Sequence, residues 1–309
     1  MLAVLLKTLP FFALIGLGYG AARVRFFPPE ATAYLTKFVF YFALSAMIFR
    51  YAATLPVGEL LNPRFLMAYL SGTMAVYLLA TCVAFLRGTS VAEAAVEAQC
   101  AAIGNTGFLG LPMLAVLLGP ASVGPVMMVL TTDLIVFSSL IVILITGAGG
   151  GRMSPAVLRT VALGLLKNPM IVAILLGLAW SGLALPMPGP LDDFLKILGA
   201  AATPGALFAI GASLADKSAE RIEVAAWLSF AKLVLHPAAV AVTSLLLYRV
   251  EPYAAGVMIA AAALPVAGNV YILAQHYGVA PQRVSASILV STAVSILTVP
   301  AVIAWVLQL

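Results

Sequence analysis

Long apolar runs follow one another along almost the entire chain, and only short polar gaps separate them. A helix needs about 20 apolar residues to cross the roughly 30 Å hydrocarbon core of a bilayer. By this criterion the sequence predicts ten membrane-spanning helices: Leu2–Ala22, Ala31–Phe49, Phe65–Leu86, Ala94–Leu117, Val123–Ile145, Leu158–Leu183, Leu191–Leu214, Val224–Tyr248, Ala254–His276 and Val284–Leu307. Charged residues make up only 9% of the 309 residues, compared with about 25% in soluble domains. We therefore expect an all-α, multi-pass membrane protein.

Two of these runs contain residues that interrupt a helix. The fourth run includes Gly104–Pro112, with three glycines, an asparagine and a proline, and the ninth includes Leu264–Tyr271, again with proline, glycine and asparagine. Proline removes a backbone donor, and the freed carbonyls need partners that hydrocarbon cannot supply. Interrupted helices in corresponding halves of a chain indicate the binding site of a secondary transporter. We expect broken helices four and nine to cross near the middle of the membrane.

The residues at these interruptions are the candidate substrate-binding site. They are Asn105, Thr106, Gly107, Pro112, Pro265, Gly268 and Asn269. Broken helices present free N–H groups at one end and free carbonyls at the other, so their crossing can attract an anion or coordinate a cation. The alternative role for the two asparagines is a hydrogen bond between helices.

Ionisable residues inside the predicted spans are the second group of candidates, because a charge within the bilayer is costly and marks a functional site by default. Asp133 lies near the middle of the fifth run, and burial of a carboxylate favours its neutral form, which suits it to carrying a proton. Lys232 can neutralise Asp133 or attract an anionic solute, unless it extends to the membrane surface. His236 is predicted to be a hydrogen-bonded core residue. Glu97 shares a helix face with Asn105 and is a further candidate for coupling.

The glycine-rich segment at the centre of the chain divides it into two halves. The predicted organisation is a first five-helix repeat over 1–146, a linker over 147–157 and a second repeat over 158–309. Because each half has an odd number of spans, the second would be inserted upside down. Ten lysines and arginines hold or border the odd-numbered gaps and five the even-numbered ones, so both termini are predicted to be non-cytoplasmic.

Several classes of function are not supported by the sequence. There is no basic tract for nucleic acid, no phosphate-binding glycine loop, no serine nucleophile motif and no cluster of histidines or cysteines with metal-ligand spacing. We therefore expect neither an enzyme nor a resident cofactor or metal, and coupling to a proton or a sodium ion instead.

The same motifs resemble those of a known family. Asn105–Pro112, Lys167–Pro169, Pro204–Gly211 and Ala263–Tyr277 are similar to the corresponding segments of the auxin efflux carrier family, which includes plant PIN-type carriers and bacterial malate and malonate permeases. The short glycine linker resembles that of a bacterial member. Where plant carriers have a second proline in the ninth span, this chain has Val270, which argues against auxin as the substrate.

The resemblance implies a fold of two inverted five-helix repeats, similar to sodium/proton antiporters and bile-acid transporters. It also implies a scaffold of the first, second, sixth and seventh spans and a transport domain that contains the crossed helices. Asn105 falls where the family's fourth-span asparagine contributes to the crossover site.

We predict a secondary active transporter of the cell inner membrane that moves a small organic anion, a mono- or dicarboxylate, by proton-coupled, elevator-type alternating access. The alternative is a sodium-coupled symporter on the same fold, with Glu97, Asn105 and Asn269 as cation ligands. The expected partners are the organic anion and the lipid bilayer. Formation of a homodimer and the direction of transport are left open.

Overall fold

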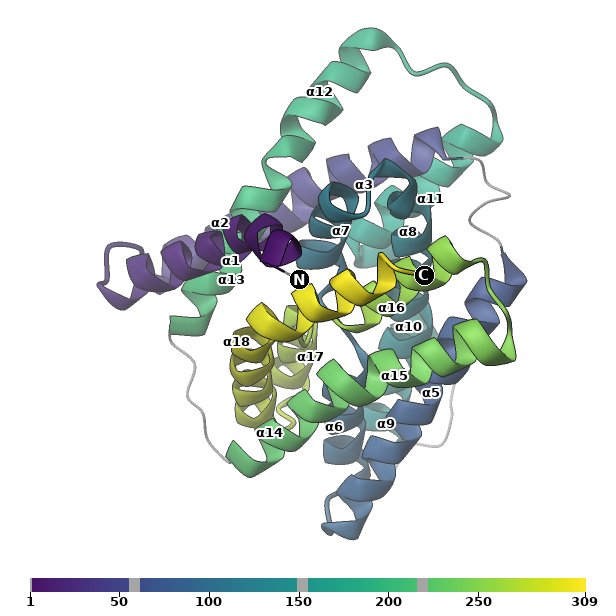
Figure 1. Ribbon diagram of the computed structural model, residues 1–309. Coiled ribbons are helices and arrows are strands. Elements are labelled where there is room, and N and C mark those ends of the chain that lie inside the picture. The colour runs from purple at the N-terminus through teal and green to yellow at the C-terminus, as the bar shows by residue number, and fades with distance from the viewer. Residues whose placement is uncertain (1, 56–61, 149–154, 216–221) are drawn as a thin grey trace.

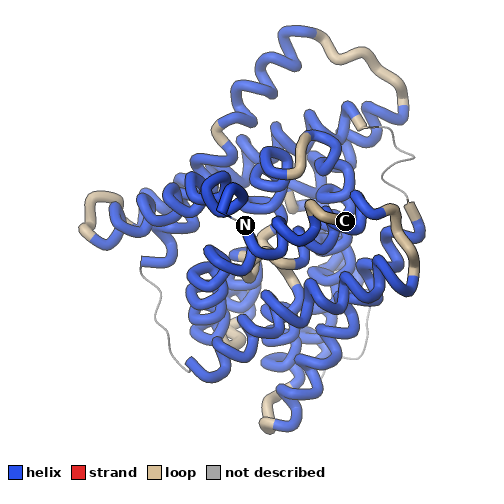
Figure 2. Tube along the Cα trace, in the orientation of Figure 1, coloured by secondary structure: helices blue, strands red, loops and turns tan. Residues whose placement is uncertain are grey.

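The computed structural model describes residues 2–55, 62–148, 155–215 and 222–309. Within these ranges every regular element is a helix, and the only strand-like pairing is one isolated bridge (Figure 2). The centre of the predicted linker, 149–154, lies outside the described residues. The all-helical class predicted from the sequence is thus confirmed for the described part of the chain.

Seven helical segments of the described chain are long and apolar enough to cross a membrane: Val4–Arg23, Pro29–Thr54, Pro63–Leu86, Pro120–Gly147, Gly189–Ala215, Ile222–Leu247 and Pro281–Val306. An eighth is obtained when Val161–Lys167 and Pro169–Gly182, which are bent by 75° at their junction, are counted as one span. Two shorter apolar helices cover Thr106–Leu117 and Pro252–Ala262. The protein is therefore a multi-pass membrane protein, while the count of ten spans stays a prediction.

The helices of the first half of the chain include short π-helical or 3-10 turns, labelled η. In order they are α1 (Leu2–Arg23), α2 (Pro29–Phe38), η1 (Val39–Ala43), α3 (Leu44–Thr54), α5 (Pro63–Leu86), α6 (Val91–Ala102), η2 (Thr106–Gly110), α7 (Leu111–Leu117), η3 (Pro120–Ser122), α8 (Val123–Thr132), η4 (Asp133–Phe137) and α9 (Ser138–Ala148). Proline occupies the first position of α2 and α5, where the missing N–H has no helical partner to lose.

The second half continues in the same way. Its elements are α10 (Pro155–Lys167), α11 (Pro169–Gly182), α12 (Gly189–Ala200), α13 (Ala202–Ala215), α14 (Ile222–Phe230), η5 (Ala231–Leu235), α15 (His236–Ala241), η6 (Val242–Leu247), α16 (Pro252–Ala262), α17 (Gly268–Tyr277) and α18 (Pro281–Val306). Asn168 begins α11 by accepting a hydrogen bond from the Met170 N–H at 3.0 Å.

Two sets of helices pack closely among themselves (Figure 1). In the first set α13 packs against α1 and α2, and α3 packs against α11 and α12. In the second set α5 packs against α6 and α15, α14 against α18, and α16 against α15 and α18. Among the contacts that join the two sets are those of η2 with α13 and of α18 with α1. The interrupted segments therefore lie next to the interface between the two sets of helices.

Helices α1 and α13 touch through their backbones. A Cβ added at Gly211 would overlap the carbonyl oxygen of Ile15, and one added at Gly18 would overlap that of Phe208. Small residues allow two membrane helices to approach this closely and gain packing energy over a long contact.

Replacing Gly211 with alanine is expected to destabilise the protein by about 1–3 kcal/mol, because the new methyl group meets backbone that cannot rotate away. Thermal unfolding of the purified protein in detergent measures this. Gly16→Ala is the matched control, since a Cβ at Gly16 meets nothing within 4 Å. Equal melting temperatures for the two variants would contradict the close contact.

Candidate functional site

The two interrupted segments meet and pair through their main chains. Gly104 and Val266 form an antiparallel bridge between the end of α6 and the end of α16. The Asn105 N–H donates to the Pro265 carbonyl at 2.8 Å, and the Ala267 N–H donates to the Ile103 carbonyl at 3.1 Å. The broken helices predicted from the sequence are observed, and they lie in direct contact.

Local hydrogen bonds satisfy the backbone at this crossing, as a buried chain requires. The Val266 N–H donates to the Ser291 hydroxyl of α18 at 3.1 Å. The Asn105 carbonyl accepts from the N–H groups of Leu109 and Gly110 in η2. Pro265 has no N–H to satisfy, which suits it to the position where α16 stops.

Four helix ends converge at the crossing. α6 and α16 end there, whereas η2 and α17 begin there. No side chain caps the beginning of η2 or of α17. Because the start of a helix carries partial positive charge and the end partial negative charge, both signs of potential are present at one place.

A cavity of about 910 Å³ lies beside the crossing. Its lining comes from α2, α13, η2, α17, α18 and the residues at the interruptions: Pro29, Thr32, Ala33, Thr36, Lys37, Asn105, Phe108, Ala206, Ala209, Ile210, Ser213, Val266, Gly268, Asn269, Tyr271, Ile272, Gln275, Pro281, Gln282, Ser285, Ile288 and Thr292. The lining includes the first turns of α2 and α18, so the cavity extends from the crossing towards those two helix ends. It is large enough for a small organic solute.

The predicted substrate-binding residues divide into two groups. Three of them line the cavity: Asn105, Gly268 and Asn269. The other four are buried and do not line it: Thr106, Gly107, Pro112 and Pro265. These four residues belong to the buried core around the crossing.

Sequence analysis did not single out Lys37, which contributes only to the count of charges that orient the spans. Among the described residues that line the cavity, it is the only charged one. Its place well inside an apolar run was the available signal, because a lysine within a span needs a partner or water. Nothing comparable in the sequence indicated that Gln275 or the hydroxyl residues of α2, α13 and α18 line the cavity.

Asp133 is buried at the start of η4, with 3% of its surface exposed. The Tyr69 hydroxyl of α5 donates to its Oδ1 at 2.7 Å. Oδ2 of the same carboxylate has no hydrogen-bond partner among the described residues, and the hydroxyl of nearby Thr106, the first residue of η2, donates to the Gly104 carbonyl at 3.4 Å. The predicted proton-carrying acid therefore lies beside the predicted substrate-binding crossing.

Lys232 is fully buried behind the crossing and does not extend to a surface. Its Nζ donates to the Ala262 carbonyl, at the end of α16, at 2.5 Å and lies 3.0 Å from His236 Nδ1. The other ring nitrogen of His236 lies 3.0 Å from the Thr73 hydroxyl. Lys232 and Asp133 interact electrostatically, but they form no direct ion pair. The Lys232 amino group thus lies against the carbonyl end of α16, which carries partial negative charge.

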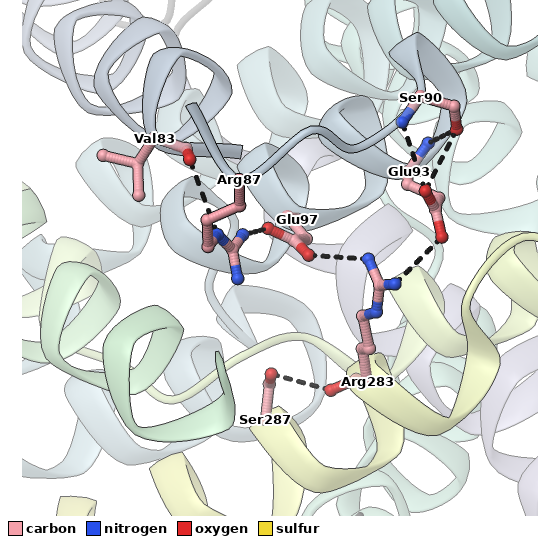
Figure 3. Close-up of polar contacts among 7 residues, drawn as sticks. All are labelled: Val83, Arg87, Ser90, Glu93, Glu97, Arg283 and Ser287. Carbon is pink, nitrogen blue, oxygen red and sulfur yellow. Dashed lines mark hydrogen bonds and ion pairs between the residues drawn. The ribbon is translucent and has the colours of Figure 1, made fainter. Parts of the chain in front are cut away.

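Glu97 is buried and belongs to a cluster of charged residues that includes Glu93 near the start of α6 (Figure 3). One of its carboxylate oxygens is bound by Arg87, and the other accepts from Arg283 of α18 at 2.9 Å. Arg283 also donates to Glu93 at 2.9 Å, and Glu93 and Ser90 cap the start of α6. The cluster fastens α6 to α18, and it occupies both oxygens of Glu97.

The fold and the cavity define a multi-pass membrane protein with a solute-sized site at a pair of interrupted helices. A family model described as "Membrane transport protein" matches residues 3–303, so the chain belongs to this family of transporters, and the resemblance to auxin efflux carriers is confirmed. The chain is also similar to a protein of Rhizobium meliloti (strain 1021) named "Putative malonate transporter": the two are 35% identical over 297 residues, which cover 94% of this chain and 92% of the relative. Both findings identify a transporter and not an enzyme.

Proposed function

We propose that this protein is a secondary active transporter that carries a small organic anion, such as malonate, across a bacterial inner membrane. The observation that supports this most directly is the cavity beside the crossing, which is lined by two asparagines next to the beginnings of η2 and α17. Backbone N–H groups at helix beginnings bind carboxylates well. The similarity to a protein named as a malonate transporter supports malonate as the first substrate to test.

Asn105 and Asn269 are the side chains that would hold the anion. Asn105 is 7% exposed, yet its side chain has no hydrogen-bond partner among the described residues. The Asn269 Oδ1 also lacks a partner within the described chain. A buried amide with unmet hydrogen bonds is unfavourable unless water or a ligand completes them. The amide N–H groups of both residues would donate to a carboxylate, whereas the Asn269 Oδ1 is an acceptor that needs a donor such as water or a protonated carboxyl group.

Asp133 would carry the coupling proton. It lies beside Thr106 at the crossing, one of its carboxylate oxygens accepts a hydrogen bond from Tyr69, and the other has no partner among the described residues. The Lys232 Nζ donates to the Ala262 carbonyl at the end of α16. Without Lys232 this carbonyl would be free to bind a metal ion. In the alternative, sodium-coupled mechanism, Glu97 would have to leave both arginines before it could ligate an ion. These contacts favour the proton over sodium.

We infer that transport follows an elevator-type displacement on a fold of ten spans in two inverted repeats. The count of ten treats each interrupted region, and the bent pair α10 and α11, as one span. With the odd-numbered gaps in the cytoplasm, the cavity would face the cytoplasm, because it extends towards the first turns of α2 and α18. Both termini would then lie outside.

Uptake of radiolabelled malonate into proteoliposomes tests the proposal. A pH gradient imposed across the vesicle membrane is expected to drive accumulation, and collapse of the gradient with a protonophore is expected to stop it. Replacement of sodium by choline should leave the flux unchanged. Flux that requires sodium would overturn proton coupling, and the absence of any binding of malonate or other small carboxylates would overturn the proposed substrate class.

A further inference from the structure

Lys37 lies in the last turn of α2 and faces the cavity. Of the described residues that line the cavity, it is the only charged one. No carboxylate in the described part of the chain pairs with it, and its Nζ lies 5.5 Å from the centroid of the Tyr34 ring. Its ammonium group is therefore free to bind an anion in the cavity.

Lys37 and Asn105 both line the cavity, and the helical segments next to them are in contact. Phe40, one turn after Lys37, stacks on Phe108, three residues after Asn105. The two rings are nearly parallel, with 3° between their planes and 6.1 Å between their centroids. This contact holds the end of α2 against η2. A solute bound at Asn105 is thus within the cavity that Lys37 also lines.

The charges around the cavity favour an anion. The beginnings of α17 and of the helix Thr106–Leu117 each contribute about half a positive charge, and the ends of α6 and α16 at the same crossing each contribute about half a negative charge. Among the described lining residues, Lys37 therefore supplies the positive charge that no other charge offsets. Behind the crossing, the formal charges of Lys232 and ionised Asp133 are opposite. A dicarboxylate would place one carboxylate at the helix beginnings and the second at Lys37.

We propose that Lys37 binds the second carboxylate of the substrate while Asn105, Asn269 and the helix beginnings bind the first. The inference rests on the proposed function and narrows it to short dicarboxylates. The lysine ammonium group has three N–H donors at the end of a flexible side chain, so it can bind carboxylates that lie at slightly different distances. Hydrogen bonds between charged groups are stronger than those between neutral groups, which gives selectivity over monocarboxylates.

The test compares binding of malonate, succinate and propionate to the full-length protein in detergent by isothermal titration calorimetry. Lys37→Gln is expected to weaken malonate and succinate binding roughly tenfold, the loss of one charge-assisted hydrogen bond. Propionate binding should stay within about twofold. Lys37→Arg keeps the charge and should retain most of the dicarboxylate affinity. Lys7→Gln, which removes an exposed lysine outside the cavity lining, is the matched control and should change neither.

Two results would overturn the inference and leave the proposed function in place. In the first, Lys37→Gln binds malonate as tightly as the wild type does. In the second, it loses malonate and propionate equally, which would make Lys37 a general attractor of anions. If the wild-type protein binds none of the three acids, the proposed function fails, and the inference fails with it. Unfolding temperatures of each variant show that a loss of binding is not a loss of folded protein.

Discussion

Asp133→Asn is expected to abolish malonate accumulation driven by a pH gradient while malonate binding persists. The amide cannot take up and release a proton, but it has nearly the same shape and can still accept the hydrogen bond from Tyr69, which is 2.7 Å long in the wild type. The cavity itself is lined by other residues, so the binding site should be preserved. Proteoliposome uptake measures the first effect and isothermal titration calorimetry the second.

Asp193→Asn provides the control for this experiment, because Asp193 is exposed and lies outside the cavity lining. It should transport as the wild type does. Full pH-driven accumulation by the Asp133 variant would remove this residue from the coupling mechanism. Loss of binding together with transport would assign Asp133 a structural role next to the crossing instead, through its hydrogen bond from Tyr69.

Asn105→Ala is expected to weaken malonate binding by roughly 10- to 100-fold, which corresponds to one or two hydrogen bonds to a charged group. Its effect on stability should be small, because the side chain has no partner among the described residues and the main-chain bond to Pro265 does not depend on it. Calorimetry and thermal unfolding of the same preparations separate the two effects.

Asn168→Ala should show the opposite pattern. Its side chain caps α11 and is absent from the cavity lining, so its removal should cost about 1 kcal/mol of stability and leave malonate binding unchanged. If Asn105→Ala instead lowers the melting temperature and keeps its affinity for malonate, Asn105 joins helices and does not bind the substrate.

The interruptions of α6 and α16 could be predicted because their signal is local. Proline, glycine and asparagine within an apolar run of membrane-spanning length have few other uses, and the requirement that every backbone group in lipid be satisfied leads directly to a broken helix. The same reasoning placed Asn105, Gly268 and Asn269 at one site, and all three line the cavity. Their function as ligands stays a prediction.

The partners of the buried charges could not be predicted, because they come from distant parts of the chain. Tyr69 and Asp133 are 64 residues apart, and Thr73 and His236 are 163 residues apart. Nothing in the spacing of either pair marks the contact. Lys37 shows the same limit, since its role depends on which helix faces α2 across the cavity. The sequence also gave no sign that arginines occupy both oxygens of Glu97.

The strand-like pairing between 103–105 and 265–267 uses only main-chain atoms of the two segments. The hydrogen bonds of this pairing therefore do not depend on the side chains that line the cavity, so those side chains can change while the link persists. The main-chain link between the two interrupted helices can thus stay the same while the side chains that contact the substrate change. One scaffold of this kind can serve acids of different length and charge after a few substitutions around the cavity.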